Sequence, residues 1–204
     1  QTADERADLI EKLLAQKSIC FDTETTDLEA RDAEPLGIAF SYRPHTGFYV
    51  ICPPEREAAI SVLKEFSPIF ENNEIEKVGH NLKYDLTVLK WHGFEVEGQL
   101  MDTMLAHSMK EPEMKHGLDY LSELYLNYKP IPTSDLIGER GETQKNMRDV
   151  PVEQVAEYAC EDADITLQVS EAIRPDIESK GVAQVCYDVE CPLIRVLVDM
   201  EHEG

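Results

Sequence analysis

The hydrophobic pattern of this chain changes near residue 70, and that change constrains the fold more than any other feature of the sequence. Before it, three short runs of apolar and β-prone residues are separated by turns that contain Pro, Gly or Asp. These runs cover residues 18–23, 36–42 and 48–52. They predict a three-stranded antiparallel meander.

After residue 70, strand and helix patterns alternate. Short apolar runs at 77–80 and 100–101 are each followed by a helical pattern, at 83–91 and 103–109. Such alternation is typical of parallel strands joined by helices, so two parallel strands are expected beside the meander. The prediction is therefore an α/β fold: a mixed five-stranded sheet, an antiparallel meander plus parallel strands, flanked by helices.

Four further helical segments are expected around this sheet. Pro68 lies inside the second segment and is expected to interrupt or kink it, because a proline removes a backbone donor. Pro175 is expected to end the third segment for the same reason. The segments cover residues 3–16, 53–70, 151–173 and 183–202. The stretch 127–151 is rich in Pro and Gly and is expected to form loops.

The charge of the chain limits what it can bind. Its 204 residues are enough for one large domain with a real core, and 42% of them are hydrophobic. Against 41 acidic residues there are 19 Lys and Arg, which gives a net charge of -22. Such a chain cannot hold a polyanion by broad charge neutralisation, so a role on nucleic acid would require metal ions or another domain.

The cysteine content indicates a reducing environment. The five cysteines include no C-x-x-C pair, which argues against a disulfide framework and against a zinc site. No run approaches the roughly 18 to 20 apolar residues of a membrane span. A reducing cytoplasm is the expected location, with no membrane partner. Because the chain starts at Gln1 without a methionine, we expect it to be a piece of a longer parent.

Two carboxylates at the end of the first predicted strand are the first candidate site. Side chains alternate along a strand, so Asp22 and Glu24 are expected to point to the same face. Adjacent anions raise each other's pKa unless a cation lies between them, and hard divalent ions such as Mg²⁺ or Mn²⁺ prefer oxygen ligands. The alternative interpretation is a pair of solvated surface acids.

Two later motifs carry further carboxylates. Asp85 falls in the first turn of the helix predicted at 83–91, where an acid complementing the helix dipole is the alternative explanation. Tyr158 and Asp162 are four residues apart on a predicted helix, which stacks a phenol and a carboxylate on one face. A half-buried amphipathic tyrosine is the alternative there. Asp164 is expected to be a structural hydrogen-bonding residue.

Together these motifs resemble the three exonuclease motifs of the DEDD superfamily, in its tyrosine-bearing branch. The similarity is greatest to the proofreading 3′-5′ exonuclease domains of bacterial family A polymerases, the DNA polymerase I group. The matching stretches are Phe-Asp-Thr-Glu-Thr at 21–25, Asn-Leu-Lys-Tyr-Asp at 81–85, Met-Asp-Thr-Met-Leu at 101–105 and Tyr-Ala-Cys-Glu-Asp-Ala-Asp-Ile-Thr-Leu-Gln at 158–168. They occur in the family's order and span almost the whole chain.

The resemblance implies a ribonuclease H-like fold and a reaction supported by two divalent metal ions, Mg²⁺ or Mn²⁺. Asp22 would bridge both ions, Glu24 and Asp162 would complete the first, and Asp85 would hold the second, largely through water. Tyr158 and Glu24 would orient the attacking water. The implied product is a nucleoside 5′-monophosphate released from a DNA 3′ end.

Substrate contacts are also implied by the resemblance. Thr23, Asn81 and Tyr84 would contact the terminal nucleotide, and Leu28 would wedge against the terminal bases unless it faces the core instead. The family's aromatic position before the third motif falls at Ser134, which puts one stacking contact in doubt.

The resemblance further implies a division of the chain and a set of partners. Residues 1–182 would form the exonuclease domain, and 183–204 would begin the helix leading into a polymerase domain. The expected partners are single-stranded or frayed DNA 3′ ends and that polymerase domain. Two alternatives stay open: a catalytically silent structural domain of a polymerase, and an RNA 3′ exonuclease similar to ribonuclease D.

Overall fold

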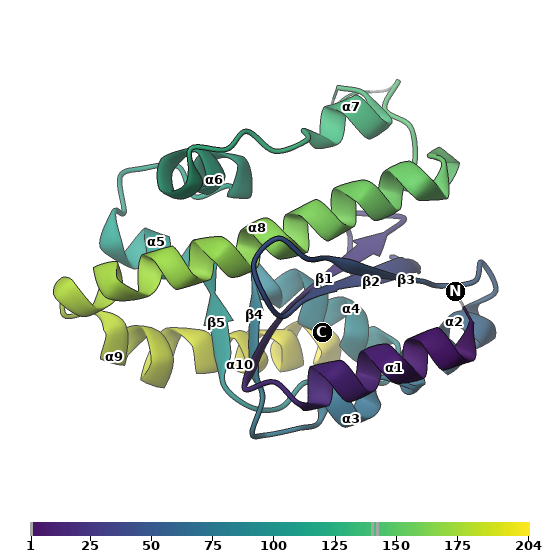
Figure 1. The fold of residues 1–204 in the computed structure, drawn as a ribbon, viewed down its shortest axis with the longest axis horizontal. Coiled ribbons are helices and arrows are strands. Elements are labelled where there is room, and N and C mark those ends of the chain that lie inside the picture. The colour runs from purple at the N-terminus through teal and green to yellow at the C-terminus, as the bar shows by residue number, and fades with distance from the viewer. Residues whose placement is uncertain (1, 140, 142) are drawn as a thin grey trace.

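A computed structural model describes residues 2–139, 141 and 143–204, and in these ranges five strands form one sheet. Their order is β3-β2-β1-β4-β5 (Figure 1). The strands are β1 (Ser18–Thr25), β2 (Pro35–Ser41), β3 (Phe48–Ile51), β4 (Glu76–Gly79) and β5 (Leu100–Asp102). β2 pairs antiparallel with β1 and β3, whereas β4 runs parallel to β1 and β5. The predicted mixed sheet is confirmed.

Helices cover both faces of the sheet. The long helix α8 packs across all of β1–β4, and α5 and α6 pack against α8 in turn. Figure 1 shows α6 and α7 along the side of α8 that faces away from α10, which packs on α4. The helices are α1 (Ala3–Leu14), α2 (Arg56–Lys64), α3 (Ser67–Phe70), α4 (Leu82–Trp91), α5 (Thr103–Lys110), α6 (Leu118–Leu126), α7 (Thr133–Ile137), α8 (Val152–Ser179), α9 (Ala183–Val185) and α10 (Cys191–Glu203).

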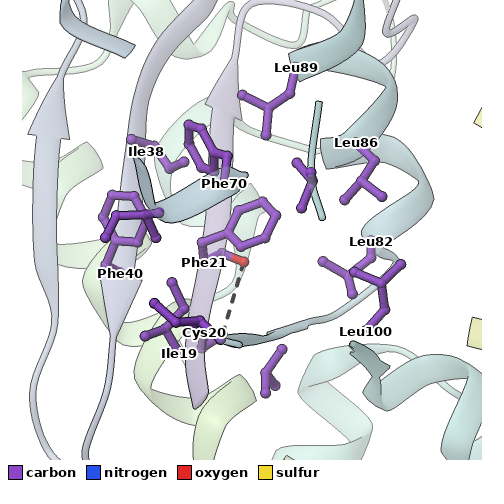
Figure 2. Packing of buried hydrophobic residues seen from close by; sticks show 14 of the residues in the cluster. Ile19, Cys20, Phe21, Ile38, Phe40, Phe70, Leu82, Leu86, Leu89 and Leu100 are labelled. Atoms are coloured by element: carbon purple, nitrogen blue, oxygen red, sulfur yellow. Dashed lines mark hydrogen bonds between the residues drawn. The ribbon is translucent and has the colours of Figure 1, made fainter. Parts of the chain in front are cut away.

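The main hydrophobic core lies on one face of β1. Phe21 of β1 meets Phe70 edge to face, with ring centroids 6.0 Å apart, and Phe40 of β2 stacks on Phe66 at 5.2 Å. Figure 2 shows Phe21, Phe40 and Phe70 gathered in this core, with Ile38 beside them. Each such side chain contributes about 1.5 to 3 kcal/mol on burial. Because Phe21 is held on this face, its neighbour Asp22 must point to the opposite one.

The structure contradicts the expectation that Pro175 ends the long helix, since α8 continues past it. Ile173 and Ile177, on either side of the proline, are fully buried. Arg174 pairs with Glu76 of β4 through Nη2 and Oε2, 2.7 Å apart. A proline inside a helix costs about 3 kcal/mol. The burial of two isoleucines offsets that cost.

Two helices lie where the sequence patterns indicated none. α6 precedes the stretch 127–151, and α7 lies inside it together with a 3₁₀ turn at Met147–Asp149. α6 buries Leu121 against Ile165 and Val169 of α8. α7 has five residues and buries none of them, so no apolar periodicity marks it in the sequence.

Pro68 interrupts the second helical segment as predicted, since α2 ends at Lys64 and α3 begins at Ser67. The C-terminal helix, expected to be continuous, contains a π-helical turn at Cys186–Glu190 between α9 and α10. A π-turn aligns residues five apart, and this one lets both Cys186 and Cys191 be fully buried. In the described ranges no helix combines the length and apolar character needed to cross a bilayer.

Candidate active site

The end of β1 presents two carboxylates on the face that α8 covers. Asp22 lies opposite Ala39 of β2, which in turn lies opposite Tyr49 of β3, so these three side chains share a face. Glu24, two residues on, belongs to the same face. β1 runs two residues past its expected end, to Thr25, with an irregular register between Glu24 and Thr25. The prediction that both acids share a face is therefore confirmed.

Small residues bring α8 close to the sheet. Ala159 and Ala163 of α8 are fully buried against Ala39. At Gly47, in the turn before β3, an added Cβ would lie 2.5 Å from the Cβ of Cys160, so only glycine permits this approach. The close packing places Tyr158 and Asp162, one helical turn apart, beside the carboxylates of β1.

These side chains line an open cleft of about 470 Å³. Asp22, Glu24, Tyr158 and Asp162 all face it. The opposite wall comes from the turn after β1, from Tyr84 of α4, and from α7 and the loop that follows it. The three predicted motifs thus meet in one place, although the first and the last are more than a hundred residues apart in the chain.

Asp85 reaches the cluster from the other side of β1. Its Oδ1 accepts hydrogen bonds from the backbone N–H of Thr23 at 2.9 Å and from Oγ1 of Thr23 at 2.6 Å. The side chain is only 3% exposed and does not line the cleft directly. Thr23, expected to contact the substrate, uses its hydroxyl to position Asp85.

A buried carboxylate that received no role from the sequence fixes the start of α4. Asp102, at the end of β5, accepts hydrogen bonds from the backbone N–H groups of Asn81 and Leu82 and from those of Met104 and Leu105. It therefore caps α5 and anchors the entry to α4, where Asn81 adopts a left-handed conformation with φ of 61°. This anchoring sets the position of Asp85 one turn into α4.

The carboxylates have unusual acid–base properties. Burial, with neighbouring carboxylates, raises the pKa of Glu24 to about 8 and holds the pKa of Asp22 well above its ordinary range. Burial also raises the pKa of Asp85 to about 7 and that of Asp162 to about 7, although Thr23 and Tyr158 respectively oppose these shifts. None of the ion pairs formed by the described residues includes any of these acids. Among the described residues, no Lys, Arg or His forms an ion pair with the cluster.

This donor set fits a hard divalent cation in its chemistry, because all the ligands are carboxylate oxygens and their charge is uncompensated. In the described part of the chain, no three Asp, Glu, His or Cys side chains are arranged so that they could hold a metal ion by themselves. An ion held by Asp22, Glu24 or Asp162 would draw its remaining ligands from water or from a bound phosphate, as Mg²⁺ commonly does.

The Tyr158 hydroxyl lies at the boundary between two cavities. Its Oη is 2.9 Å from Oγ1 of Thr133, the first residue of α7. Thr133, Tyr158 and Asp162 line both the main cleft and a smaller cavity of about 300 Å³ that also includes Ser134. Burial raises the pKa of Tyr158 far above its ordinary value of 10.0, so the phenol keeps its proton.

The remaining expected substrate residues are placed differently from one another. Leu28 is 79% exposed at the cleft rim, so the alternative that it faces the core is wrong. Tyr84 lines the cleft, but its hydroxyl is bonded to Thr25 and to the backbone carbonyl of Asp27. Asn81 is exposed at the start of α4 and does not line the cleft.

Sequence reasoning missed two polar groups near the site. Thr133 has no motif around it, and its neighbourhood was expected to be loop. Lys145 is exposed and lines the cleft, the one Lys or Arg among its described lining residues. A lone lysine in a strongly acidic chain carries little signal. As expected, Asp164 has a structural role, since it accepts hydrogen bonds from the backbone N–H groups of His45 and Thr46.

Solved structures share this fold. M. smegmatis Pol1, described as its POL domain with DNA primer-template and dNTP, superposes with a TM-score of 0.76 at 20% identity, covering 100% of this chain and 32% of that chain. Escherichia coli RNase D, an exoribonuclease involved in structured RNA processing, superposes with a TM-score of 0.73 at 22% identity. The match covers 97% of this chain and 49% of that chain. Brucella melitensis NrnC with bound Mg²⁺ superposes with a TM-score of 0.71 at 16% identity, and the match covers 93% of this chain and 87% of that chain. The fold is therefore ribonuclease H-like, as expected.

Sequence comparisons identify the family. The chain is 37% identical over 204 residues to DNA polymerase I of Chloroflexus aurantiacus, which covers 97% of this chain and 21% of that protein. It is 31% identical over 202 residues to DNA polymerase I of Borreliella burgdorferi, and this match covers 97% of this chain and 22% of that protein. The chain thus spans about a fifth of the length of these relatives. Because the profile of the 3′-5′ exonuclease family of family A DNA polymerases matches residues 1–178, this chain belongs to that family.

Proposed function

We propose that this domain hydrolyses the terminal phosphodiester of a DNA 3′ end and releases nucleoside 5′-monophosphates, with the help of two divalent metal ions. The observation that carries the proposal is the cluster of Asp22, Glu24, Asp85 and Asp162, whose charge no described cation balances. Glu24 and Asp85 are buried and Asp22 and Asp162 are half-buried, and a chain at -22 would not collect such acids at a cleft unless a cation compensated them. The same acids argue against a silent structural domain, which has no need of them.

Each carboxylate has a distinct role in this proposal. Asp22 would help to hold both ions, Glu24 and Asp162 would complete the ligands of the first, and Asp85 would support the second, largely through water. When bound, the ions supply a water of lowered pKa and positive charge at the leaving 3′ oxygen. Thr23 keeps Asp85 oriented by donating two hydrogen bonds to one of its oxygens.

Tyr158 and Glu24 orient the attacking water. The phenol is protonated at neutral pH, since its ordinary pKa of 10.0 already lies well above 7 and burial raises it further, so its hydroxyl acts as a hydrogen-bond partner and not as a base. Glu24 lies on the same wall of the cleft and accepts a hydrogen bond from that water. The water attacks phosphorus, and the bond from phosphorus to the 3′ oxygen of the preceding nucleotide breaks.

The substrate would be a single-stranded or frayed 3′ end. The net charge of -22 allows few phosphate contacts, and among the described residues that line the cleft Lys145 is the cation available for one. Affinity then comes from the metal ions and from apolar contact of unpaired bases with Leu28, which projects from the rim. Stacking contributes roughly 1 to 3 kcal/mol per base and requires that the base be unpaired. A mismatched terminus is thereby favoured over a paired one.

The C-terminal segment is proposed to connect this domain with a polymerase domain of the same parent chain. Residues 1–182 form the exonuclease domain, and 183–204 begin the connecting helix. The support is a stripe of exposed apolar side chains, most of them three or four residues apart, that runs along α9, the π-helical turn and α10. It consists of Val185, Val189, Leu193, Val196, Leu197 and Met200.

This connection can be tested with Val196→Asp and Met200→Asp. In a full-length polymerase, both substitutions should lower the melting temperature and expose the junction to protease. In the 204-residue chain alone they should cost almost nothing, because both side chains are already exposed. Equal effects in the two settings would contradict a docked polymerase domain.

The proposed activity is tested by calorimetry and by trimming assays on matched oligonucleotides. Titration with Mn²⁺ should reveal two binding events, whereas a silent domain should show none. Oligonucleotides of one sequence, made as DNA and as RNA, separate the main proposal from a ribonuclease D-like activity. Faster trimming of the RNA would reverse the assignment of substrate.

A further inference from the structure

A short segment that joins α6 to the first residue of α7 crosses the outer side of α8, where Glu161 binds it at two points. We call residues 128–133 the strap. Both carboxylate oxygens of Glu161 bind it: the hydroxyl of Tyr128 donates to Oε1 at 2.5 Å, and the backbone N–H of Ile131 donates to Oε2 at 2.7 Å. Pro130 and Pro132 restrict the strap's backbone further.

The far end of the strap touches the proposed catalytic tyrosine. Thr133 Oγ1 lies 2.9 Å from Tyr158 Oη. Glu161 is three residues after Tyr158 on α8, so the anchor and the tyrosine lie on the same side of that helix. Thr133 is also part of the wall between the main cleft and the smaller cavity, both of which reach Asp162. One contact thus joins the strap to the reacting centre.

The direction of this hydrogen bond decides where the phenolic proton goes. Either oxygen can donate in the contact between Thr133 and Tyr158. A phenol has a single O–H, so a Tyr158 that donates to Thr133 has no proton left for a water in the cleft. When Thr133 donates to Tyr158 Oη, the phenolic proton is free to point into the cleft.

We propose that Thr133 is a positioning residue for Tyr158, and that Glu161 holds Thr133 in place through the strap. The inference rests on the proposed nuclease function. By donating to the phenolic oxygen, Thr133 fixes the rotation of the Tyr158 O–H toward the attacking water. Without that donor the O–H would rotate freely, and fewer encounters would find it aligned.

The test uses single-turnover trimming of a single-stranded DNA oligonucleotide in Mg²⁺. Thr133→Val keeps the volume of the side chain and removes its hydroxyl, and should slow the cleavage step about 10-fold, the scale of one lost hydrogen bond. KM should be unchanged, and Thr133→Ser should restore the rate. Thr46→Val is the matched control, because among the described residues its hydroxyl donates only to the backbone carbonyl of Arg43, and Thr46 does not line the cleft. It should retain the rate of the unmodified chain.

A double substitution separates positioning from an independent role. In a Tyr158→Phe background, Thr133→Val should cause no further loss, because the hydroxyl that it positions is already absent. The proposal is wrong if Thr133→Val cleaves at the rate of the unmodified chain. It is also wrong if Thr133→Val lowers the cleavage rate of Tyr158→Phe by the same factor as it lowers that of the unmodified chain. If the unmodified chain does not trim DNA at all, the proposed function has failed instead. Melting temperatures of all variants identify any loss of folding.

The anchor is tested separately by hydrogen exchange. Glu161→Ala removes both acceptors, so the amide of Ile131 should exchange faster and the trimming rate should fall as in Thr133→Val. Thr133→Val itself should leave the Ile131 amide protected. Unchanged protection and an unchanged rate in Glu161→Ala would remove Glu161 from the proposal.

Discussion

Replacing Glu24 with glutamine should stabilise the metal-free protein at neutral pH. Glu24 is 6% exposed, and burial beside other carboxylates raises its pKa from 4.5 to about 8. A carboxyl whose pKa is raised on folding binds its proton more tightly in the folded state. The folded state therefore loses stability as the pH rises from about 4.5 to 8. Glutamine has nearly the same shape and no charge, so it removes this loss.

The expected magnitude follows from the pKa shift. At pH 7 the ionisation of Glu24 in the unfolded state lowers the free energy of unfolding by 2.303RT multiplied by the difference between pH 7 and 4.5, or about 3 kcal/mol. At pH 5 it falls to less than about 1 kcal/mol. For a protein of this size, 1 kcal/mol shifts the melting temperature by about 2 to 4 °C. Glu24→Gln should thus raise it by about 6 to 12 °C at pH 7 and by very little at pH 5.

The assay is thermal unfolding in EDTA at both pH values, followed by circular dichroism. Glu29→Gln is the matched control, because Glu29 is exposed in the turn after β1 and forms no ion pair in the described structure. It should change the melting temperature little at either pH. Added Mn²⁺ should stabilise the parent more than the variant. A drop in melting temperature at pH 7, or an equal gain at pH 5, would refute the electrostatic reasoning.

Three further predictions follow from the same site. Tyr158→Phe should slow cleavage by roughly 10²- to 10⁴-fold while Mn²⁺ affinity, measured by calorimetry, stays the same; a loss of affinity would mean that the tyrosine contributes to the metal site. Binding of Mn²⁺ at pH 7 should release protons and strengthen as the pH rises to 8, because Glu24 has a pKa of about 8 and Asp85 and Asp162 of about 7; binding heats that do not depend on the buffer's ionisation enthalpy would exclude this. Single-stranded and mismatched 3′ ends should be trimmed faster than paired ends, with log K falling by only about 0.7 for each neutralised phosphate; equal rates or a steep salt dependence would contradict the proposed mode of binding.

Local sequence rules predicted the parts of the site that lie within single elements. Strand alternation placed Asp22 and Glu24 on one face of β1, and helical spacing placed Tyr158 and Asp162 on one face of α8. The order of strand and helix patterns was enough for the mixed sheet. These rules succeed because each depends only on neighbours within a few residues.

Features that depend on distant contacts escaped these rules. Pro175 was expected to end a helix that tertiary packing carries on, through buried Ile173 and Ile177. Asp102 is an anchor for two helices, yet in the sequence it is one acid among 41. The contact between Thr133 and Tyr158 joins residues from separate segments, and no local pattern marks it.

The central claim is that the carboxylate cluster supports metal-dependent cleavage from a DNA 3′ end. It is tested most directly by following a 5′-labelled single-stranded oligonucleotide with the parent chain and with Asp22→Ala, each in Mn²⁺ and in EDTA. The account predicts stepwise shortening from the 3′ end and nucleoside 5′-monophosphates only for the parent in Mn²⁺. Asp22→Ala should keep its fold, shown by an unchanged circular dichroism spectrum, and lose the activity. Trimming by Asp22→Ala at a rate near that of the parent, or trimming by the parent in EDTA, would contradict the account.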